Sequence, residues 1–437
     1  MDWWLALILL MGLMMILMFA GVPVVIAFLL TDIVGVLVFM GGVSGIRQLV
    51  INLEDSLTSF SLLPVPLFII MGEVMFQSQM GFKAIDVIDQ WIGRLPGRLS
   101  LVAVITGTIF ATMSGSTIAS AAILGSLLCP EMERRGYHKS MSLGPIMGAG
   151  GLAMLIPPSA LAILLAALCN ISVGGLLIAS IIPGFLVAFL YATYIIVRCW
   201  LQPELAPSYP SPAIPIKTKL KNLLIYVVPL GLIIFLVMGL VFLGVATPSE
   251  SAALGTAGSL FLAMAYGRMN GQVIKKTIIG TVRVTSMMFM IIIGSTTFSQ
   301  ILAFSGASAG LIGVVSQLDI HPILILICMQ TMLLGLGCLM DNLSMVMIAI
   351  PIYLPIIEAL KFDPIWFAVM TLINMELGNL SPPFGLLLFV MKGMGPPGTT
   401  MMDVYRAAIP YVLLDILAIA MIMVFPSIAL YLPSLLR

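Results

Sequence analysis

The sequence predicts an all-α polytopic membrane protein, an inverted repeat in which each copy has five membrane spans and one re-entrant hairpin. Three observations support this prediction. The chain of 437 residues is 61% hydrophobic and only 8% charged, whereas a soluble domain carries about 25% charged residues. A set of proline and glycine landmarks recurs at one fixed spacing. Basic residues surround one copy of a predicted hairpin and are nearly missing around the other.

Apolar runs of roughly 20 residues, the length that crosses a bilayer, recur along the chain. Examples lie at 3–19, 223–243 and 409–430. The 40 glycines and 27 prolines argue against a bundle of straight helices. Outer-membrane barrel strands would alternate polar and apolar residues, and these runs do not. A net charge of +1 leaves no basis for nucleic-acid binding.

The internal repeat has a register of 225 residues. The motif Ile156-Pro157-Pro158-Ser159 resembles Ser381-Pro382-Pro383-Phe384, and the two proline pairs lie 225 positions apart. The same spacing joins three further landmark pairs: Pro23 and Pro248, Gly81 and Gly306, Pro130 and Pro355. Beyond the Pro-Pro motifs the spacing becomes 227, as a two-residue loop insertion would produce. Repeats of this kind are the mark of many transporter folds.

We expect the following elements in chain order. The first copy occupies 1–202, with spans near 3–19, 24–41 and 60–78, a hairpin at 99–128, a broken span at 141–165 and a span near 176–198. A proline-rich linker follows at 203–221. The second copy occupies 222–437, with spans near 223–243, 249–266 and 285–304, a hairpin at 323–354, a broken span at 365–389 and a span near 405–431.

Two segments, 43–58 and 267–283, are too polar to span the membrane. We expect them to be helical arms that lie along the membrane interface. Five spans are an odd number, so the second copy must enter the bilayer upside down relative to the first.

The distribution of basic residues agrees with this inversion, because positive residues mark the cytoplasmic side. The segments that flank the first hairpin contain Lys83, Arg94, Arg98, Arg134, Arg135 and Lys139. The matching segments of the second copy contain only Lys361. We therefore expect hairpin 99–128 to open toward the cytoplasm and hairpin 323–354 to open toward the other side.

Two candidate sites follow from the repeat. Each combines a hairpin tip with the interruption of a span: Met113–Thr117 with Gly148–Ser159, and Gly335–Ser344 with Gly378–Pro383. Irregular backbone inside a membrane survives only where it is buried in protein or lines a cavity. Its freed carbonyls suit a cation such as Na⁺, and half-helix N-termini suit an anionic substrate. The alternative is that these glycines and prolines are ordinary kinks and close-packing positions.

Acidic residues within the apolar spans also have two interpretations. An intramembrane carboxylate is costly and commonly functional, which singles out Asp341 at the second tip; its alternative role is a helix cap. Glu73, Glu376, Asp32 and Asp415 lie within or beside apolar spans. We expect these four to be buried partners or interfacial residues rather than ligands, and the sequence does not assign them individual roles.

At these positions the chain resembles the large membrane subunit of TRAP (tripartite ATP-independent periplasmic) transporters. The resemblance covers nearly the whole chain. It rests on these stretches: Ser114-Gly115-Ser116-Thr117, Cys129 to Tyr137, Leu155 to Ser159, Thr247 to Glu250, Asp341, Pro351, Pro355, Asp363 to Phe367, and Ser381 to Gly385.

The resemblance implies a fold like that of the ion-transporter superfamily and an elevator mechanism driven by a Na⁺ gradient, with at least two Na⁺ sites. It also implies a bacterial inner-membrane location, a separate small membrane subunit of four helices, and a periplasmic substrate-binding protein. Substrates in the family are mostly organic acids, such as C4-dicarboxylates and sialic acids, and some members carry ectoine-like compounds.

Carried over by position, the resemblance implies two sets of site residues. The Na⁺ ligands would be Ser114, Ser116, Gly148, Gly151, Pro157, Gly335, Gly337, Asp341, Gly378 and Pro382. The substrate would lie near Thr117, Pro158, Asn342, Ser381 and Pro383. Neither tip nor break contains Arg or Lys, so a carboxylate would rely on hydroxyls, amides, helix N-termini and bound cations. A neutral or zwitterionic substrate stays open as an alternative.

The sequence contains none of the common catalytic or nucleotide-binding motifs, so we do not expect an enzyme or an ATP-driven pump. Two alternative functions remain open at this point. One is a Na⁺/carboxylate symporter of the same architecture that works without a binding protein, and the other is a passive channel.

Overall fold

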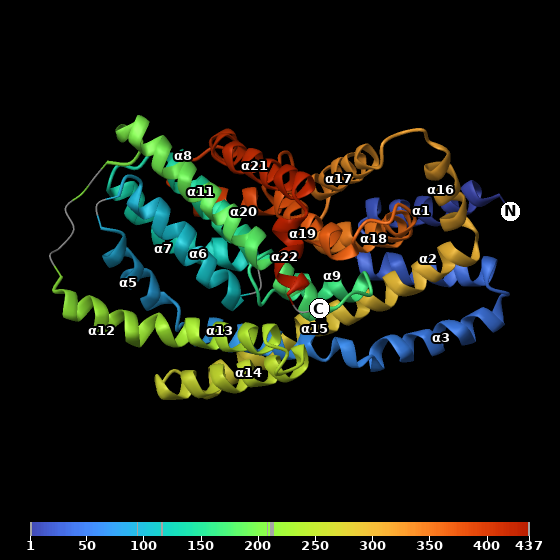
Figure 1. The fold of residues 1–437 in the computed structure, drawn as a ribbon, viewed down its shortest axis with the longest axis horizontal. Coiled ribbons are helices and arrows are strands. Elements are labelled where there is room, and N and C mark those ends of the chain that lie inside the picture. The colour runs from blue at the N-terminus through green and yellow to red at the C-terminus, as the bar shows by residue number, and fades with distance from the viewer. Residues whose placement is uncertain (1, 94, 115–116, 208, 210–213, 436–437) are drawn as a thin grey trace.

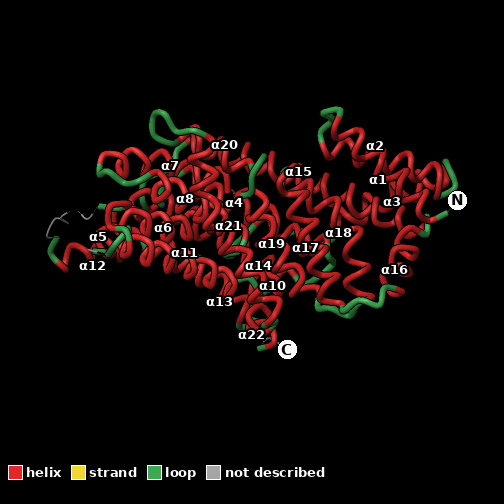
Figure 2. Tube along the Cα trace, turned by 90° about the horizontal axis from the view of Figure 1, so that it is seen from above, coloured by secondary structure: helices red, strands yellow, loops and turns green. Residues whose placement is uncertain are grey.

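The computed structural model describes residues 2–93, 95–114, 117–207, 209 and 214–435, and in these the regular secondary structure is entirely helical. The molecule is elongated, with the N-terminus at one end and the C-terminus near the middle (Figure 1). Figure 2 shows the same arrangement from above, with short loops joining the helices. The absence of strands in the described part agrees with the predicted all-α class.

The first half, in chain order, has helices with these bounds: α1 (Trp3–Phe19), α2 (Val24–Phe39), α3 (Val43–Thr58), the short 3-10 turn η1 (Phe60–Leu62), α4 (Pro64–Gln77), α5 (Phe82–Ile92), α6 (Arg98–Ser114), α7 (Thr117–Arg134), α8 (Lys139–Gly151), η2 (Leu152–Met154), α9 (Ala160–Leu168), α10 (Val173–Ala179) and α11 (Ile181–Leu201).

The turn η3 (Pro203–Leu205) precedes the second half, whose helices have these bounds: α12 (Ile216–Tyr226), α13 (Val228–Phe242), α14 (Pro248–Ala265), α15 (Gly271–Phe304), α16 (Ala307–Gln317), α17 (Pro322–Leu339), α18 (Asn342–Ala359), α19 (Pro364–Leu380), α20 (Leu386–Met394), α21 (Met401–Val424) and α22 (Ser427–Ser434). Helix α12 begins inside the segment that we expected to be linker.

The helix boundaries recur at the spacing found in the sequence. Helices α5 and α16 begin and end 225 residues apart, and α7 and α18 do the same. Both Pro-Pro motifs, Pro157-Pro158 and Pro382-Pro383, contain a cis peptide bond. The division of the chain at 203–221 and the opposite orientation of the copies stay predictions, because no membrane is part of the structure.

One expected boundary is wrong. The arm at 267–283 and the span near 285–304 form a single helix, α15, of 34 residues. In the first half the corresponding arm and span, α3 and α4, are separate helices. Proline favours a helix start at this point, because it removes a helical hydrogen bond and clashes with the preceding turn, although Pro351 and Pro355 lie inside the continuous helix α18. Pro64 and Pro66 lie where the second half has Phe289 and Ile291.

The hydropathy of the helices fits a membrane protein. Among the described residues, five helical segments are long and apolar enough to cross a bilayer, or seven if each bent pair counts as one span. The bent pairs are α4 with α5, at 74°, and α12 with α13, at 44°. By length and composition α17 and α18 belong to the five. The re-entrant character of the segment 323–354 therefore stays a prediction.

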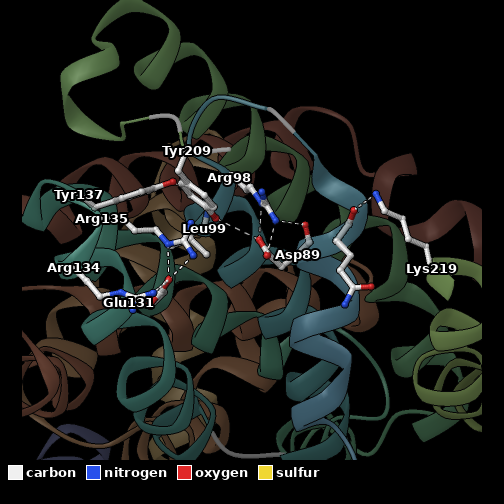
Figure 3. Close-up of polar contacts among 10 residues, drawn as sticks. Asp89, Arg98, Leu99, Glu131, Arg134, Arg135, Tyr137, Tyr209 and Lys219 are labelled. Atoms are coloured by element: carbon white, nitrogen blue, oxygen red, sulfur yellow. Dashed lines mark hydrogen bonds and ion pairs between the residues drawn. The ribbon is translucent and has the colours of Figure 1, made fainter. Parts of the chain in front are cut away.

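A network of charged groups lies where α6 begins and α7 ends, at the polar end of the predicted hairpin 99–128 (Figure 3). Arg98, at the start of α6, makes an ion pair with Asp89 of α5 at 2.5 Å. The ring of Tyr209 lies between the guanidinium groups of Arg98 and Arg135, at 4.8 Å and 3.4 Å from its centroid. Lys219 of α12 donates a hydrogen bond to the carbonyl of Gln90. The segment between the halves thus contacts the first residue of α6 and the residue that follows α7.

Candidate functional site

Both predicted breaks interrupt a helix at the Pro-Pro motif. Helix α8 ends at Gly151, and the chain passes through η2 and an irregular segment before α9 starts at Ala160. Helix α19 ends at Leu380 and α20 starts at Leu386. The Ser159 hydroxyl accepts a hydrogen bond from the Ala162 amide and so caps α9. Serine favours this position because it satisfies an amide that has no partner within the helix.

The two breaks and the two tips meet at a cavity of about 580 Å³. One wall, here called the break wall, consists of lining residues from the tips and breaks: Thr117, Ile118, Ala119, Pro158, Ala160, Leu161, Asp341, Asn342, Leu343, Asn379 and Leu386. The opposite wall, here called the α4/α15 wall, consists of lining residues from those two helices: Phe68, Ile69, Gly72, Glu73, Phe76, Gln77, Lys276, Ile279, Gly280, Arg283, Val284, Met287 and Met288.

Three of the five predicted substrate residues, Thr117, Pro158 and Asn342, line this cavity. Asn342 is almost fully buried, and its side-chain carbonyl has no hydrogen-bond partner among the described residues. A buried polar atom without a partner costs free energy unless a ligand or water satisfies it. The other two predicted residues, Ser381 and Pro383, are not among the lining residues.

Ser381 and Pro383 have partners of their own. The Ser381 hydroxyl donates to the Leu377 carbonyl at 2.7 Å. The Pro383 carbonyl accepts from the Tyr405 hydroxyl at 2.9 Å. These contacts hold the second break against the preceding turn and against α21, so both residues support the shape of the break in this conformation.

In the first half, the predicted ion-binding glycines face side chains from other helices. A Cβ on Gly148 would lie 2.6 Å from the Tyr411 ring and 2.9 Å from the Tyr191 ring. A Cβ on Gly151 would collide with the carboxylate of Glu376. Pro157 lies at the break itself, directly before the cavity-lining Pro158. Ser116 is outside the described residues, and so is the side chain of Ser114.

A buried polar cluster lies behind these glycines. The Tyr191 hydroxyl is 2.5 Å from an oxygen of Asp415 and 3.1 Å from an oxygen of Glu376. All three side chains are completely buried. The cluster joins α11, α19 and α21 beneath the first break. From the sequence we expected both carboxylates to be buried partners or interfacial residues, and these contacts show them as buried partners.

In the second half, two predicted ion-binding glycines meet through their backbones. A Cβ on Gly378 would lie 2.8 Å from the Cα of Gly337, and a Cβ on Gly337 would lie 2.9 Å from the Cα of Gly378. This contact brings tip and break of the second half together. Gly335 has open space around it, and Pro382 lies in the break next to Pro383.

Asp341 caps helix α18. Its carboxylate accepts hydrogen bonds from the amides of Leu343 and Ser344 and from the Ser344 hydroxyl. This is the cap that the sequence left open as an alternative role, and Asp341 lines the cavity as well. The structure therefore shows the capping contact, and the ion-binding role of Asp341 stays a prediction.

Sequence reasoning missed the charged groups of the α4/α15 wall. Lys276, Gly280, Arg283 and Met287 recur at intervals of four, three and four residues, which places them on one face of α15. That periodicity is readable in the sequence, but the polarity of the segment suggested an interfacial arm. Glu73 and Gln77 lie on one face of α4 for the same reason. Asn379, on the break wall, belongs to the second predicted break but not to the predicted set of site residues.

Glu73 packs directly against α15. A Cβ on Gly280 would lie 2.6 Å from the Glu73 carboxylate, so only glycine leaves room for it. The Gln77 side chain donates a hydrogen bond to one oxygen of Glu73 at 3.0 Å. The cavity is thus bounded by an uncharged break wall, apart from the capping Asp341, and by an α4/α15 wall with Glu73, Lys276 and Arg283.

The comparison with known families gives one match over almost the full chain. Residues 11–428 match the model of the tripartite ATP-independent periplasmic transporter, DctM component. The chain is 30% identical over 395 residues to the C4-dicarboxylate TRAP transporter large permease protein of Pseudomonas aeruginosa, covering 89% of this chain and 90% of that protein.

Two further relatives are named for other substrates. The chain is 27% identical over 423 residues to the ectoine TRAP transporter large permease protein of Halomonas elongata, covering 96% of this chain and 97% of that protein. It is 27% identical over 423 residues to the sialic acid TRAP transporter large permease protein of Vibrio cholerae, covering 96% of both chains.

Among solved structures, the Alcanivorax borkumensis YdaH transporter superposes with a TM-score of 0.61 at 16% identity, covering 88% of this chain and 89% of that one. Neisseria gonorrhoeae MtrF superposes with a TM-score of 0.59 at 13% identity, covering 88% and 85%. These likenesses concern the fold alone, and they agree with the predicted all-α architecture.

The family places the chain among multi-pass transporters of the inner membrane and not among enzymes, as the sequence predicted. The matched region includes both tips, both breaks and the cavity between them. The chain therefore belongs to the family of TRAP transporter large permease subunits, the DctM component.

Proposed function

We propose that this chain is the large membrane subunit of a Na⁺-coupled secondary transporter that imports an organic acid by an elevator mechanism. The observation that carries the proposal is the cavity at which both tips and both breaks meet the α4/α15 wall. Relatives of similar length are named for C4-dicarboxylates, sialic acid and ectoine. We extend the proposal to a periplasmic binding protein that delivers the substrate and to a separate small four-helix membrane subunit.

The cavity suggests how a substrate would be carried. The breaks belong to helices that pack closely on one another, with α8 against α6, α7 and α21, and α19 against α17 and α21. The α4/α15 wall belongs to a second group, in which α4 packs on α14 and α15 packs on α2. A substrate between the two groups would change its exposure when one group slides along the other.

Sodium fits the chemistry of the breaks as a co-transported ion. Irregular backbone there supplies carbonyl oxygens, which are hard ligands. A Cβ on Gly385 would lie 2.8 Å from the Asn379 carbonyl carbon and 3.0 Å from the Ser381 oxygen, so the second break folds tightly around that glycine. We propose at least two Na⁺ sites, one at each break, in accordance with the repeat.

Uptake into proteoliposomes tests this function. We expect radiolabelled succinate or N-acetylneuraminate to accumulate when an inward Na⁺ gradient is imposed together with the binding protein and the small subunit, and to stop accumulating when choline replaces Na⁺. Uptake by this chain alone would instead indicate a symporter that needs no binding protein. Equilibration without accumulation, independent of Na⁺, would indicate a channel and would overturn the proposal.

A further inference from the structure

The α4/α15 wall supplies the only lysine and arginine side chains that line the cavity among the described residues. Lys276 and Arg283 lie on one face of α15, about two turns apart. Neither makes an ion pair with any described residue. Two cations that face a cavity without internal partners attract an anionic group.

Glu73 is a carboxylate on the same wall of the cavity as this pair. Its carboxylate lies against Gly280, which is four residues after Lys276 and three residues before Arg283. The Gln77 amide holds one of its oxygens at 3.0 Å. Asp341, the other carboxylate that lines the cavity, already accepts hydrogen bonds from the first turn of α18. Glu73 is therefore a carboxylate that lines the cavity from the same wall as the two cations, and it makes no ion pair with either of them here.

The break wall differs from the α4/α15 wall in the charge of its polar side chains. Its polar side chains next to the cavity are Thr117, Asn342 and Asn379, apart from the capping Asp341. Hydroxyl and amide groups orient a substrate through hydrogen bonds but add little attraction for its charge. Among the described side chains that line the cavity, the positive charge that attracts a carboxylate is on the α4/α15 wall.

We propose that Lys276 and Arg283 bind the carboxylate of the substrate and that Glu73 competes with this carboxylate for the same two cations. The inference rests on the proposed transport of an organic acid and names residues that recognise it. If the broken spans move relative to the α4/α15 wall, the cations act on the substrate only in conformations in which both walls face it. Glu73 then favours release, because it replaces the departing carboxylate.

Substrate binding to the purified full-length chain tests the proposal, with succinate and N-acetylneuraminate as probes in NaCl, followed by calorimetry. Lys276→Gln and Arg283→Gln should each weaken binding by about tenfold. Glu73→Gln should tighten it severalfold, which a folding defect would not do. Lys275→Gln is the matched control, because Lys275 is the neighbouring residue on α15 and does not line the cavity.

The outcomes separate this proposal from the function on which it rests. If the wild-type chain binds succinate or N-acetylneuraminate and the Lys276 and Arg283 variants bind equally well, the proposed cation pair is wrong while the transport function stands. The same holds if Lys275→Gln weakens binding as much, or if Glu73→Gln weakens it. If the wild-type chain binds neither probe, the proposed substrate class and this inference are both overturned.

Discussion

The two halves of the molecule follow the same register but differ in one long helix. In the first half, α3 and α4 are separated by η1, and Pro64 begins the second helix. In the second half, α15 runs unbroken for 34 residues through the equivalent region. The comparison shows that a shared register predicts where helices lie but not whether they are continuous. Pro64 at the start of α4 fits the break, because proline is well placed in the first turn of a helix. Proline alone does not decide continuity, because Pro351 and Pro355 lie inside the continuous helix α18.

The comparison also shows that the charged residues of the cavity have no charged counterparts in the other half. The residues 225 positions from Lys276, Arg283 and Glu73 are Ile51, Thr58 and Phe298. The backbone arrangement is thus repeated, whereas the charged α4/α15 wall occurs once. The cavity therefore has one charged wall, and a substrate with one charged end would bind with that end toward it.

The largest loss of stability is expected when a proline is placed in α15 at the position equivalent to Pro64. Phe289 is the counterpart of Pro64, and Phe289→Pro places a proline inside a continuous helix. Such a substitution costs about 3 kcal/mol or more. We expect a large fall in the melting temperature of the purified protein, together with loss of uptake. Phe289→Ala is the control for the loss of the ring, and equal melting of the two variants would show that continuity of α15 is unimportant.

The next effect concerns the contact between tip and break in the second half. Gly378→Ala would place a Cβ 2.8 Å from the backbone of Gly337, which cannot yield as a flexible side chain could. Overpacking of this kind costs about 1–3 kcal/mol. Gly335→Ala, on the same tip, meets open space and should keep or raise the melting temperature. Similar melting of both variants would contradict the close packing of tip and break.

Substitutions of Asp341 can separate its role as a helix cap from its proposed role as a Na⁺ ligand. Asparagine caps a helix nearly as well as aspartate, whereas alanine does not, at a cost of about 1 kcal/mol. Asp341→Asn should therefore keep the thermal stability that Asp341→Ala loses. If Asp341 also binds Na⁺, both variants should raise the Na⁺ concentration needed for half-maximal uptake. Unchanged Na⁺ dependence in both variants would leave capping as its role.

The smallest effect is expected in the segment between the two halves, at the ring of Tyr209 between Arg98 and Arg135. Tyr209→Leu removes the cation–π contacts and should cost about 1 kcal/mol, whereas Tyr209→Phe keeps the ring. Burial, reinforced by Asp89, raises the pKa of the Tyr209 hydroxyl above its ordinary value of 10.0. The contribution of this hydroxyl to the free energy of unfolding is fully present below pH 10.0, and it is lost as the pH rises above that value.

Thermal unfolding at neutral and alkaline pH measures both parts of this prediction. Tyr209→Phe should melt like the wild type at neutral pH and lose less stability than the wild type in alkaline buffer. A Tyr209→Leu variant that melts like the wild type would show that the contact with the two guanidinium groups contributes little.

Much of the fold is predictable because the membrane imposes simple rules. Spans must be apolar and about 20 residues long, and proline pairs interrupt them at recognisable positions. The breaks at Pro157-Pro158 and Pro382-Pro383 can therefore be located from the amino-acid pattern alone. The continuity of α15 was missed because the polar residues 267–283 suggested a separate interfacial arm. Within the helix, Lys276 and Arg283 line the cavity.

The sequence by itself determined the helical class, the repeat register, the positions of the two Pro-Pro breaks and the family. All of these depend on local composition or on regular spacing along the chain. Only the tertiary structure decided which residues share the cavity, because Glu73, Lys276 and Asn342 belong to separate helices. It also showed that Gly151 makes room for Glu376, whereas Gly378 lies against Gly337. Contacts between residues far apart in the chain depend on how helices pack, and no local pattern records that packing.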